Sequence, residues 1–236
     1  MVLLRGAISG FNRSRRSHNF VLTGSQHRRI GTTATAASAM NTGASGMGLL
    51  GMVGNADEQA DWVEFELDGN QVQGWLWMMP MHNGDIVEVV AELTEKNRYV
   101  AYAVKRDADK LLAVYPHATA GRKAHYRKSA KAWLWCALLA SLISTFLFVM
   151  QGQSNDLLNN HTCLYLANLF ALSVPFSAVI AFRVSRKLMG FVWLAEVIFR
   201  AFGWPNVENI DLRQTSKENR REDKLPDFGH LYFRYK

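Results

Sequence analysis

Cysteine is scarce in this chain of 236 residues, which contains only Cys136 and Cys163. Two cysteines exclude a disulfide-stapled scaffold and a metal site built from four thiolates. Proline is also rare, with five residues, and 49% of the residues are hydrophobic, a composition that excludes a disordered chain. The sequence therefore predicts a folded protein of one to two domains.

The motifs of common catalytic and metal-binding sites are missing as well. The seven histidines show no paired ligand spacing such as HExxH, and no glycine-rich phosphate loop precedes a lysine. Nucleophile-elbow and kinase motifs are absent. Asp85 and Glu88 lie at a turn and on a strand face, where a solvated carboxylate is the simplest interpretation. We expect no enzyme, no catalytic, cofactor-binding or metal-binding residues, and no cofactor.

Charge is absent from two long apolar runs. Residues 132–150 have 16 apolar side chains of 19 and residues 162–182 have 16 of 21, and neither run contains a charged residue. At about 1.5 Å per residue, each helix would cross a hydrocarbon layer of roughly 30 Å. The alternative, a pair of buried helices in a soluble core, is disfavoured because soluble helices of this length carry a charged face. We predict a two-helix transmembrane hairpin within 121–187.

The charges that flank these runs orient the hairpin. The loop between them, 151–161, contains one acid, Asp156, and no lysine or arginine. Basic residues stand outside both runs: Arg122, Lys123, Arg127, Lys128 and Lys131 before the first, and Arg183, Arg186 and Lys187 after the second. We therefore expect a multi-pass protein of a bacterial inner membrane, and the positive-inside rule places both of its termini in the cytoplasm. The few polar groups in the spans, such as Ser141, Ser144 and Thr145, indicate helix packing more than ion conduction, because no ionisable group accompanies them.

Residues 1–120 are expected to form a β-rich cytoplasmic domain. Val63, Phe65 and Leu67 alternate with acidic residues, the period-two pattern of a half-buried strand. About seven short strands follow from such patterns: LLRGAIS, NFVLT, WVEFELDG, QVQGWLW, IVEVVAEL, YVAYAVKR and LLAVY. A small antiparallel barrel of the OB or SH3-like type would close such a sheet and remove its edges. The predicted fold class is therefore an α+β membrane protein.

A barrel of this kind invites a nucleic-acid hypothesis. The basic residues that favour it are Arg13, Arg15, Arg16, Arg28 and Arg29. The aromatic residues Trp75, Trp77, Tyr99 and Tyr102 fall within strand patterns, where they more often belong to the core or the sheet surface. We expect no nucleic-acid partner.

An uncharged segment with six glycines, 31–54, is inserted in this domain. Small residues recur there every four positions, from Ala34 to Gly46, a spacing that lets helices approach closely. Three interpretations remain open: a mobile loop, a helix that docks on the membrane or on another subunit, and a third span.

The segment 188–236 is predicted to be an interfacial amphipathic helix followed by a cytoplasmic tail. Glu196 and Arg200 are spaced to pair across one helical turn, and a third span centred on them would be costly. A helix in the membrane interface would place Trp193 and Trp204 at headgroup level. The tail is expected to be solvated, with an aromatic end, LYFRYK, able to dock on the barrel.

The stretches GWLWMMPMHNGDIVEVVAE, YVAYAVKR and LLAVYPHATAGRKAHY resemble a family of small proteobacterial inner-membrane proteins. That family is linked to type VI secretion and is labelled as type VI secretion system effectors. The resemblance covers roughly residues 60–130 and extends loosely over the spans and the tail. Proteins of this shape also resemble immunity proteins, which protect the producing cell from pore-forming effectors.

Three functions are considered, of which the first two follow from this resemblance. The leading one is immunity-type protection against a membrane-acting effector, bound in or at the bilayer. The alternative is the membrane-inserting, pore-forming effector itself, and a third is a membrane-anchored scaffold of another envelope complex. The expected partners are the lipid bilayer, a toxin or a secretion-system component, and further copies of the chain in a homo-oligomer.

Overall fold

The protein consists of two compact units. The structure, a computed structural model, describes residues 1–18, 58–94, 98–148, 174–175, 177–186, 188–219 and 229–235. One unit, here called the head, comprises Met1–Ala124 and Met189–Lys236, and the other, here called the helical unit, comprises His125–Leu188. This division differs from the predicted one, because 189–236 joins the barrel instead of forming a separate interfacial segment.

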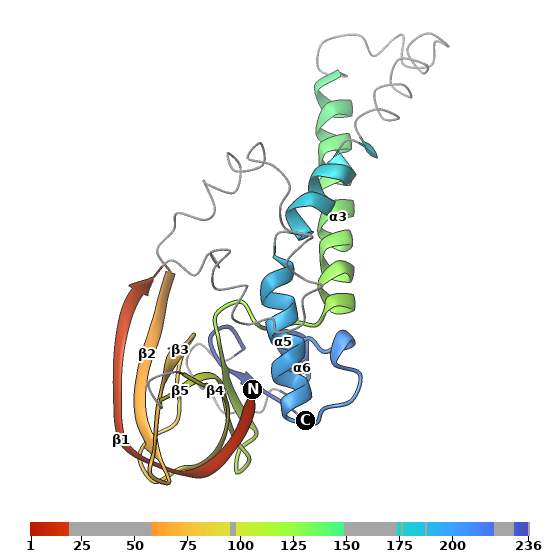
Figure 1. Ribbon diagram of the computed structural model, residues 1–236. Helices are drawn as coiled ribbons and strands as arrows, with labels where there is room; N and C mark the ends of the chain where they lie inside the picture. The colour runs from red at the N-terminus through yellow and green to blue at the C-terminus, as the bar shows by residue number, and fades with distance from the viewer. Residues whose placement is uncertain are drawn as a thin grey trace. The chain divides into compact units, whose positions relative to one another are not determined.

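Five strands of the head close into a small barrel (Figure 1). They lie in the order β3-β2-β1-β4-β5 with antiparallel pairing, and a short parallel pairing of β3 with β5 completes the ring. The predicted α+β small barrel is confirmed, and its strand order is of the OB type. The five strands are β1 Val2–His18, β2 Glu58–Leu67, β3 Asn70–Leu76, β4 Ile86–Leu93 and β5 Tyr99–Arg106.

The first strand is longer than predicted and serves two neighbours. β1 has 17 residues, of which the first part pairs with β4 and the rest with β2. A register shift between Ser9 and Asn12 marks a bulge, which bends the strand where it passes from one neighbour to the other. The predicted strand NFVLT lies outside the described residues.

The barrel closes where β3 and β5 approach closely. Val72 and Gln73 pair with Tyr99 and Val100, and the next residue of β3 is Gly74. A Cβ atom at Gly74 would lie 2.4 Å from the carbonyl oxygen of Ala101, which no side chain tolerates. Glycine at this position therefore permits the closure of the ring. Alternate side chains of the strands fill the interior, including the predicted Val63, Phe65 and Leu67.

A second apolar layer covers the outer face of β4, β5 and the following strand. The chain adds β6 Leu111–Val114 and β7 Phe233–Arg234 to the sheet edge, and three helical elements: α5 Met189–Ala201, η5 Val207–Asn209 and α6 Leu212–Glu218. Leu194, Ile198 and Phe199 of α5 are fully buried in a cluster with residues of β4, β5 and β6. The aromatic end of the chain docks on the barrel as expected, since Phe233 lies in the same cluster.

The prediction of an interfacial helix at 188–204 is therefore wrong for α5. Its apolar face is covered by the sheet of its own head, which buries eight of its 13 residues. The predicted pair of Glu196 with Arg200 is present, with 3.3 Å between the charged atoms. Trp204 stacks on Phe199 and Phe202 and contacts Tyr235, so it belongs to the head and not to a headgroup layer.

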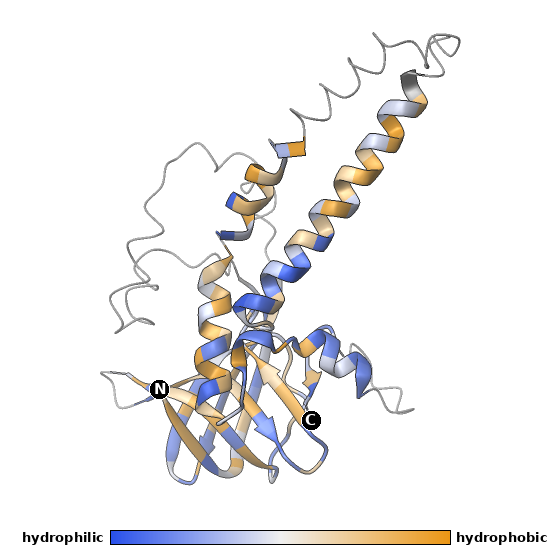
Figure 2. Ribbon diagram, turned by 90° about the vertical axis from the view of Figure 1, so that its right-hand side faces the viewer, coloured by the Kyte–Doolittle hydropathy of each residue, from blue (hydrophilic) through white to orange (hydrophobic). Residues whose placement is uncertain are grey.

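The helical unit is dominated by α3 Arg122–Phe148, a helix of 27 residues. It is the one helix among the described residues that is long and apolar enough to cross a membrane, and the apolar window is not buried by the rest of the protein. Figure 2 shows its basic residues at the base and its apolar residues above them. Of the second predicted span, 162–182, the structure describes 174–175 and 177–182, which are helical, so the predicted hairpin is not shown as a pair. Residues 31–54 and the loop 151–161 lie outside the described residues.

Candidate functional sites of the head

Glu196 binds the first residue of the long helix α3 within the head. This side chain of α5 is fully buried, and its Oε1 atom accepts a hydrogen bond of 2.9 Å from the backbone N–H of Arg122, the first residue of α3. The guanidinium of Arg122 lies 3.6 Å from the same atom, and that of Arg200 lies 3.3 Å from Oε2. The first N–H groups of a helix have no partner within it and carry partial positive charge. A buried carboxylate therefore both satisfies and neutralises the start of α3.

The backbone before α3 is also held tightly. A Cβ atom at Gly121 would lie 2.1 Å from the carbonyl oxygen of Val207, so only glycine allows this approach to η5. The N–H of Gly121 donates to the carbonyl of Ile210 over 2.9 Å. Glu208 lies beside Lys123 and Arg122, and the hydrogen bond from Lys123 contributes most to lowering the pKa of its carboxyl. These contacts fix the base of α3 to α5 and η5.

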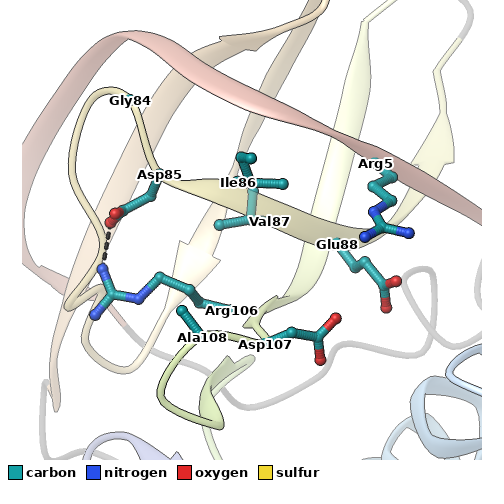
Figure 3. A pocket seen from close by; sticks show the side chains of 9 residues that line it. All are labelled: Arg5, Gly84, Asp85, Ile86, Val87, Glu88, Arg106, Asp107 and Ala108. Atoms are coloured by element: carbon teal, nitrogen blue, oxygen red, sulfur yellow. Dashed lines mark hydrogen bonds and ion pairs between the residues drawn. The ribbon is translucent and has the colours of Figure 1, made fainter.

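A shallow cavity of about 250 Å³ lies on the head at the start of β4. Figure 3 shows that the charged side chains of its wall come from β1, from β4 and the turn before it, and from the end of β5 and the turn after it. The lining residues are Arg5, Gly84, Asp85, Ile86, Val87, Glu88, Arg106, Asp107 and Ala108.

Arg106 neutralises two carboxylates at this cavity. Its guanidinium pairs with Asp85 and donates 2.6 and 3.0 Å hydrogen bonds to Asp109. The hydrogen bond to Asp109 contributes most to raising the pKa of Arg106. Asp85 also accepts the backbone N–H of His82 at 2.8 Å, which closes the turn before β4. The carboxylate of Asp85 is thus structural, and the prediction that it is merely solvated is wrong.

Lys105 forms ion pairs with the two other carboxylates of the wall, Glu88 and Asp107. Its ammonium lies 2.5 Å from Glu88, its cross-strand partner, and 3.3 Å from Asp107. Asp107 also accepts a hydrogen bond from the hydroxyl of Tyr235, which is the main cause of the lowered pKa of Asp107. Burial, followed by this hydrogen bond, raises the pKa of Tyr235. Glu88 is therefore ion-paired as well, and the network ties the end of the chain to β5.

The chemistry of this cavity is that of a structural ion network. Asp85, Glu88, Asp107 and Arg106 all have ion-pair partners, and no serine, threonine, cysteine or histidine lines the wall. A general acid or base needs a proton acceptor or donor that is not already committed to an ion pair. Among the described residues no group of three or more His, Cys, Asp or Glu side chains is arranged to hold a metal ion.

The basic residues of the nucleic-acid hypothesis are largely engaged in the head. Arg13 and Arg15 lie 3.9 and 3.6 Å from Asp61, a buried carboxylate that also accepts the backbone N–H of Met79 at 3.0 Å. Arg16 donates to the hydroxyl of Ser14 over 2.9 Å. These arginines fix the far end of the β1–β2 ribbon. Arg28 and Arg29 lie outside the described residues.

The aromatic residues of that hypothesis are likewise part of the fold. The Trp77 ring contacts that of His117 at a tilt of 52° and lies under the guanidinium of Arg213, and its backbone N–H donates to the carbonyl of Val114. Tyr102 is partly buried, donates to Glu92 over 3.3 Å, and has a pKa raised mainly by burial. The expectation that Trp77 and Tyr102 belong to the core or to the sheet surface is confirmed.

Hydroxyl groups of the helical unit bond to helix backbone and to each other. Ser141 donates to the carbonyl of Ala137 at 2.8 Å, and Thr145 donates to that of Ser141 at 3.0 Å. Ser177 accepts a 3.1 Å hydrogen bond from the indole of Trp133 on α3. Hydroxyls bonded in this way need no water, which fits the predicted packing role.

Buried Glu196, Asp61 and Lys105 are the important side chains that sequence reasoning did not identify as such. The spacing of Glu196 and Arg200 suggested a surface pair, and nothing in the sequence indicated that Arg122 would complete it. No protein-family model, no curated protein and no solved structure matches this chain.

Proposed function

We propose that this chain is an inner-membrane protein of the immunity type, whose helices anchor the head and whose role is to neutralise a membrane-acting effector. One observation carries the membrane part of this proposal: α3 exposes its apolar side chains. Trp135, Leu142 and Phe146 are 67%, 59% and 62% exposed, and no described residue covers them. An apolar surface of this extent is stable in lipid and costly in water.

Contacts between α3 and the helical segment 177–186 support a hairpin. Trp133 bonds to Ser177, and His125 and Ser129 bond to Ser185. Eight residues separate His125 from Trp133 and eight separate Ser177 from Ser185, as two antiparallel helices in constant register require. The basic residues at the base of both helices, and their absence from the loop 151–161, favour a cytoplasmic location for both termini.

The immunity role is favoured over a pore-forming role by the chemistry of α3. Its hydroxyls at Ser141 and Thr145 are bonded within the helix, and the apolar part of the helix contains no ionisable side chain. A water-filled path is normally lined by such groups. The resemblance to proteins of type VI secretion supplies the antibacterial context of the proposal.

Membrane potential in cells that express this chain alone tests the proposal. An immunity protein should leave the potential and growth unchanged, and it should preserve the potential when a pore-forming type VI effector is expressed with it. Loss of potential on expression alone, abolished by replacing Ser141, Ser144 and Thr145 with leucine, would instead establish the pore-forming effector. A protein with no effect in either experiment would be a membrane-anchored scaffold.

A further inference from the structure

The outer face of β1, β2 and β3 carries rows of exposed and half-buried polar and aromatic side chains. Strand register places them in three rows: Ser14 with Trp62 and Trp75, Asn12 with Glu64 and Gln73, and Ser9 with Glu66 and Gln71. We call this surface the tryptophan face. The helices α5 and α6 lie on the opposite side of the barrel (Figure 1), so none of the described helices of the head covers it.

Two tryptophans form a fixed aromatic platform at one end of the face. The rings of Trp62 and Trp75 meet edge to face with centroids 5.1 Å apart. The indole N–H of Trp62 donates to Glu64 over 2.9 Å, which orients both side chains. Both tryptophans are only half-buried, although large aromatic side chains on a sheet are usually covered.

The charge of the face is opposite to that of the chain. The net charge of the protein is +7, but Glu64 and Glu66 are carboxylates that form no ion pair among the described residues. Among the described residues, the basic side chain placed beside the rows is that of Arg16, which bonds to Ser14 at the tryptophan end. Carboxylates repel the phosphates of a nucleic acid and attract lysine and arginine, and tryptophan rings attract the same cations through their π faces.

The spacing of these groups matches an extended peptide. Trp62, Glu64 and Glu66 alternate along β2, so their Cα atoms repeat at about 6.8 Å. Alternate side chains of an extended strand repeat at the same distance. We propose that the tryptophan face binds a protein partner through an extended segment with lysine or arginine at every second position. This inference goes beyond the proposed function, since it concerns the head and holds for either role at the membrane.

The test uses the full chain in uncharged detergent micelles and a fluorescein-labelled peptide, (Lys-Ala)6, whose binding is followed by fluorescence anisotropy. The substitutions Glu64→Gln and Glu66→Gln should each weaken binding about 2- to 5-fold, since each removes one exposed ion pair. Both are isosteric changes at surface positions, so the fold is retained. Glu218→Gln, which removes an exposed carboxylate of α6 on the other side of the head, is the matched control and should leave the affinity unchanged.

Trp62→Phe should weaken binding further, because the indole N–H to Glu64 and the larger π face are both lost. Equal affinities for the wild type, E64Q and E66Q would overturn the proposal, as would an equal loss in E218Q. Tighter binding of an oligouridylate in the E64Q/E66Q double variant would assign the face to a nucleic acid instead. Salt-independent binding of chitohexaose that needs Trp62 would assign it to a glycan.

Discussion

Replacing Glu196 with alanine should loosen the attachment of the long helix to the head. The substitution removes the acceptor of the Arg122 N–H, which is a hydrogen bond to a charged group and contributes about 1.5–3 kcal/mol. It also removes buried methylene groups, at about 0.8 kcal/mol each. The loss is offset in part because a buried carboxylate no longer needs to be desolvated. The expected net destabilisation is about 2–3 kcal/mol.

The side chains of Arg122 and Arg200 are 43% and 55% exposed, so the charges left behind remain solvated and add little to this value. Glu196→Gln keeps an acceptor of the same size and should cost about 1 kcal/mol. For a protein of 150–250 residues, 1 kcal/mol corresponds to about 2–4 °C in Tm. We therefore expect Glu196→Ala to lower Tm by about 5–10 °C and Glu196→Gln by about 2–4 °C.

Thermal melts of the detergent-solubilised chain, followed by tryptophan fluorescence, measure this change. Five of the seven tryptophans lie in the head, so the signal reports chiefly on that unit. Glu208→Ala is the matched control, because this partly exposed carboxylate contacts the same Arg122 and its loss should shift Tm much less. A Tm of Glu196→Ala within about 2 °C of the wild-type value would refute the conclusion that Glu196 stabilises the start of α3.

Gly74→Ala should destabilise the head by about 1–3 kcal/mol, because the new methyl group would collide with the carbonyl of Ala101. An unchanged melting temperature would show that β3 and β5 do not approach each other as described. Asp107 has a lowered pKa in the folded state, so its contribution to stability is present above its unfolded pKa of about 3.9 and is lost as pH falls through the folded value. Thermal melts at pH 7, 4 and 3 should therefore show a fall in Tm as the pH is lowered. The substitutions Asp107→Asn and Tyr235→Phe should each make that fall smaller. Reporter fusions at Asn155 and at the C-terminus should give periplasmic and cytoplasmic signals respectively, and two cytoplasmic signals would contradict the hairpin topology.

The barrel was predictable because its strands alternate apolar and polar residues. Val63, Phe65 and Leu67 are buried as their spacing indicates, and the more accessible acids Glu64 and Glu66 lie between them. The sequence did not reveal that LLRGAIS begins a strand of 17 residues, because the polar residues from Asn12 onward show no apolar alternation. They pair with β2 as a ribbon in which Asp61 and the arginines replace an apolar core.

The position of α5 was not predictable from its own residues. An apolar helix can cover lipid or a sheet equally well, and Trp193 and Trp204 suggested lipid. The informative signal lay elsewhere, in the run Leu111 to Val114, whose four residues are all buried. A strand without polar alternation is buried on both faces, which requires a second layer over the sheet. That layer is α5.

The ion pairs of the charged cavity depend on pairing between strands and not on sequence neighbours. Glu88 and Lys105 are 17 positions apart and meet because β4 and β5 pair in that register. A one-residue slip would have placed them on opposite faces. Sequence reasoning had no access to this register and therefore treated Asp85 and Glu88 as solvated.

The discontinuous head has a consequence for biosynthesis. Strands β1 to β6 leave the ribosome before the helical unit, whereas α5 and β7, which cover the outer face of β4 to β6, are translated after it. The outer apolar face of the barrel therefore stays uncovered until the helical unit and the segment after it have been synthesised. A chain truncated before α5 cannot complete its head, and its uncovered apolar face exposes it to chaperones and proteases. Completion of the head therefore requires that the helical unit has been translated first.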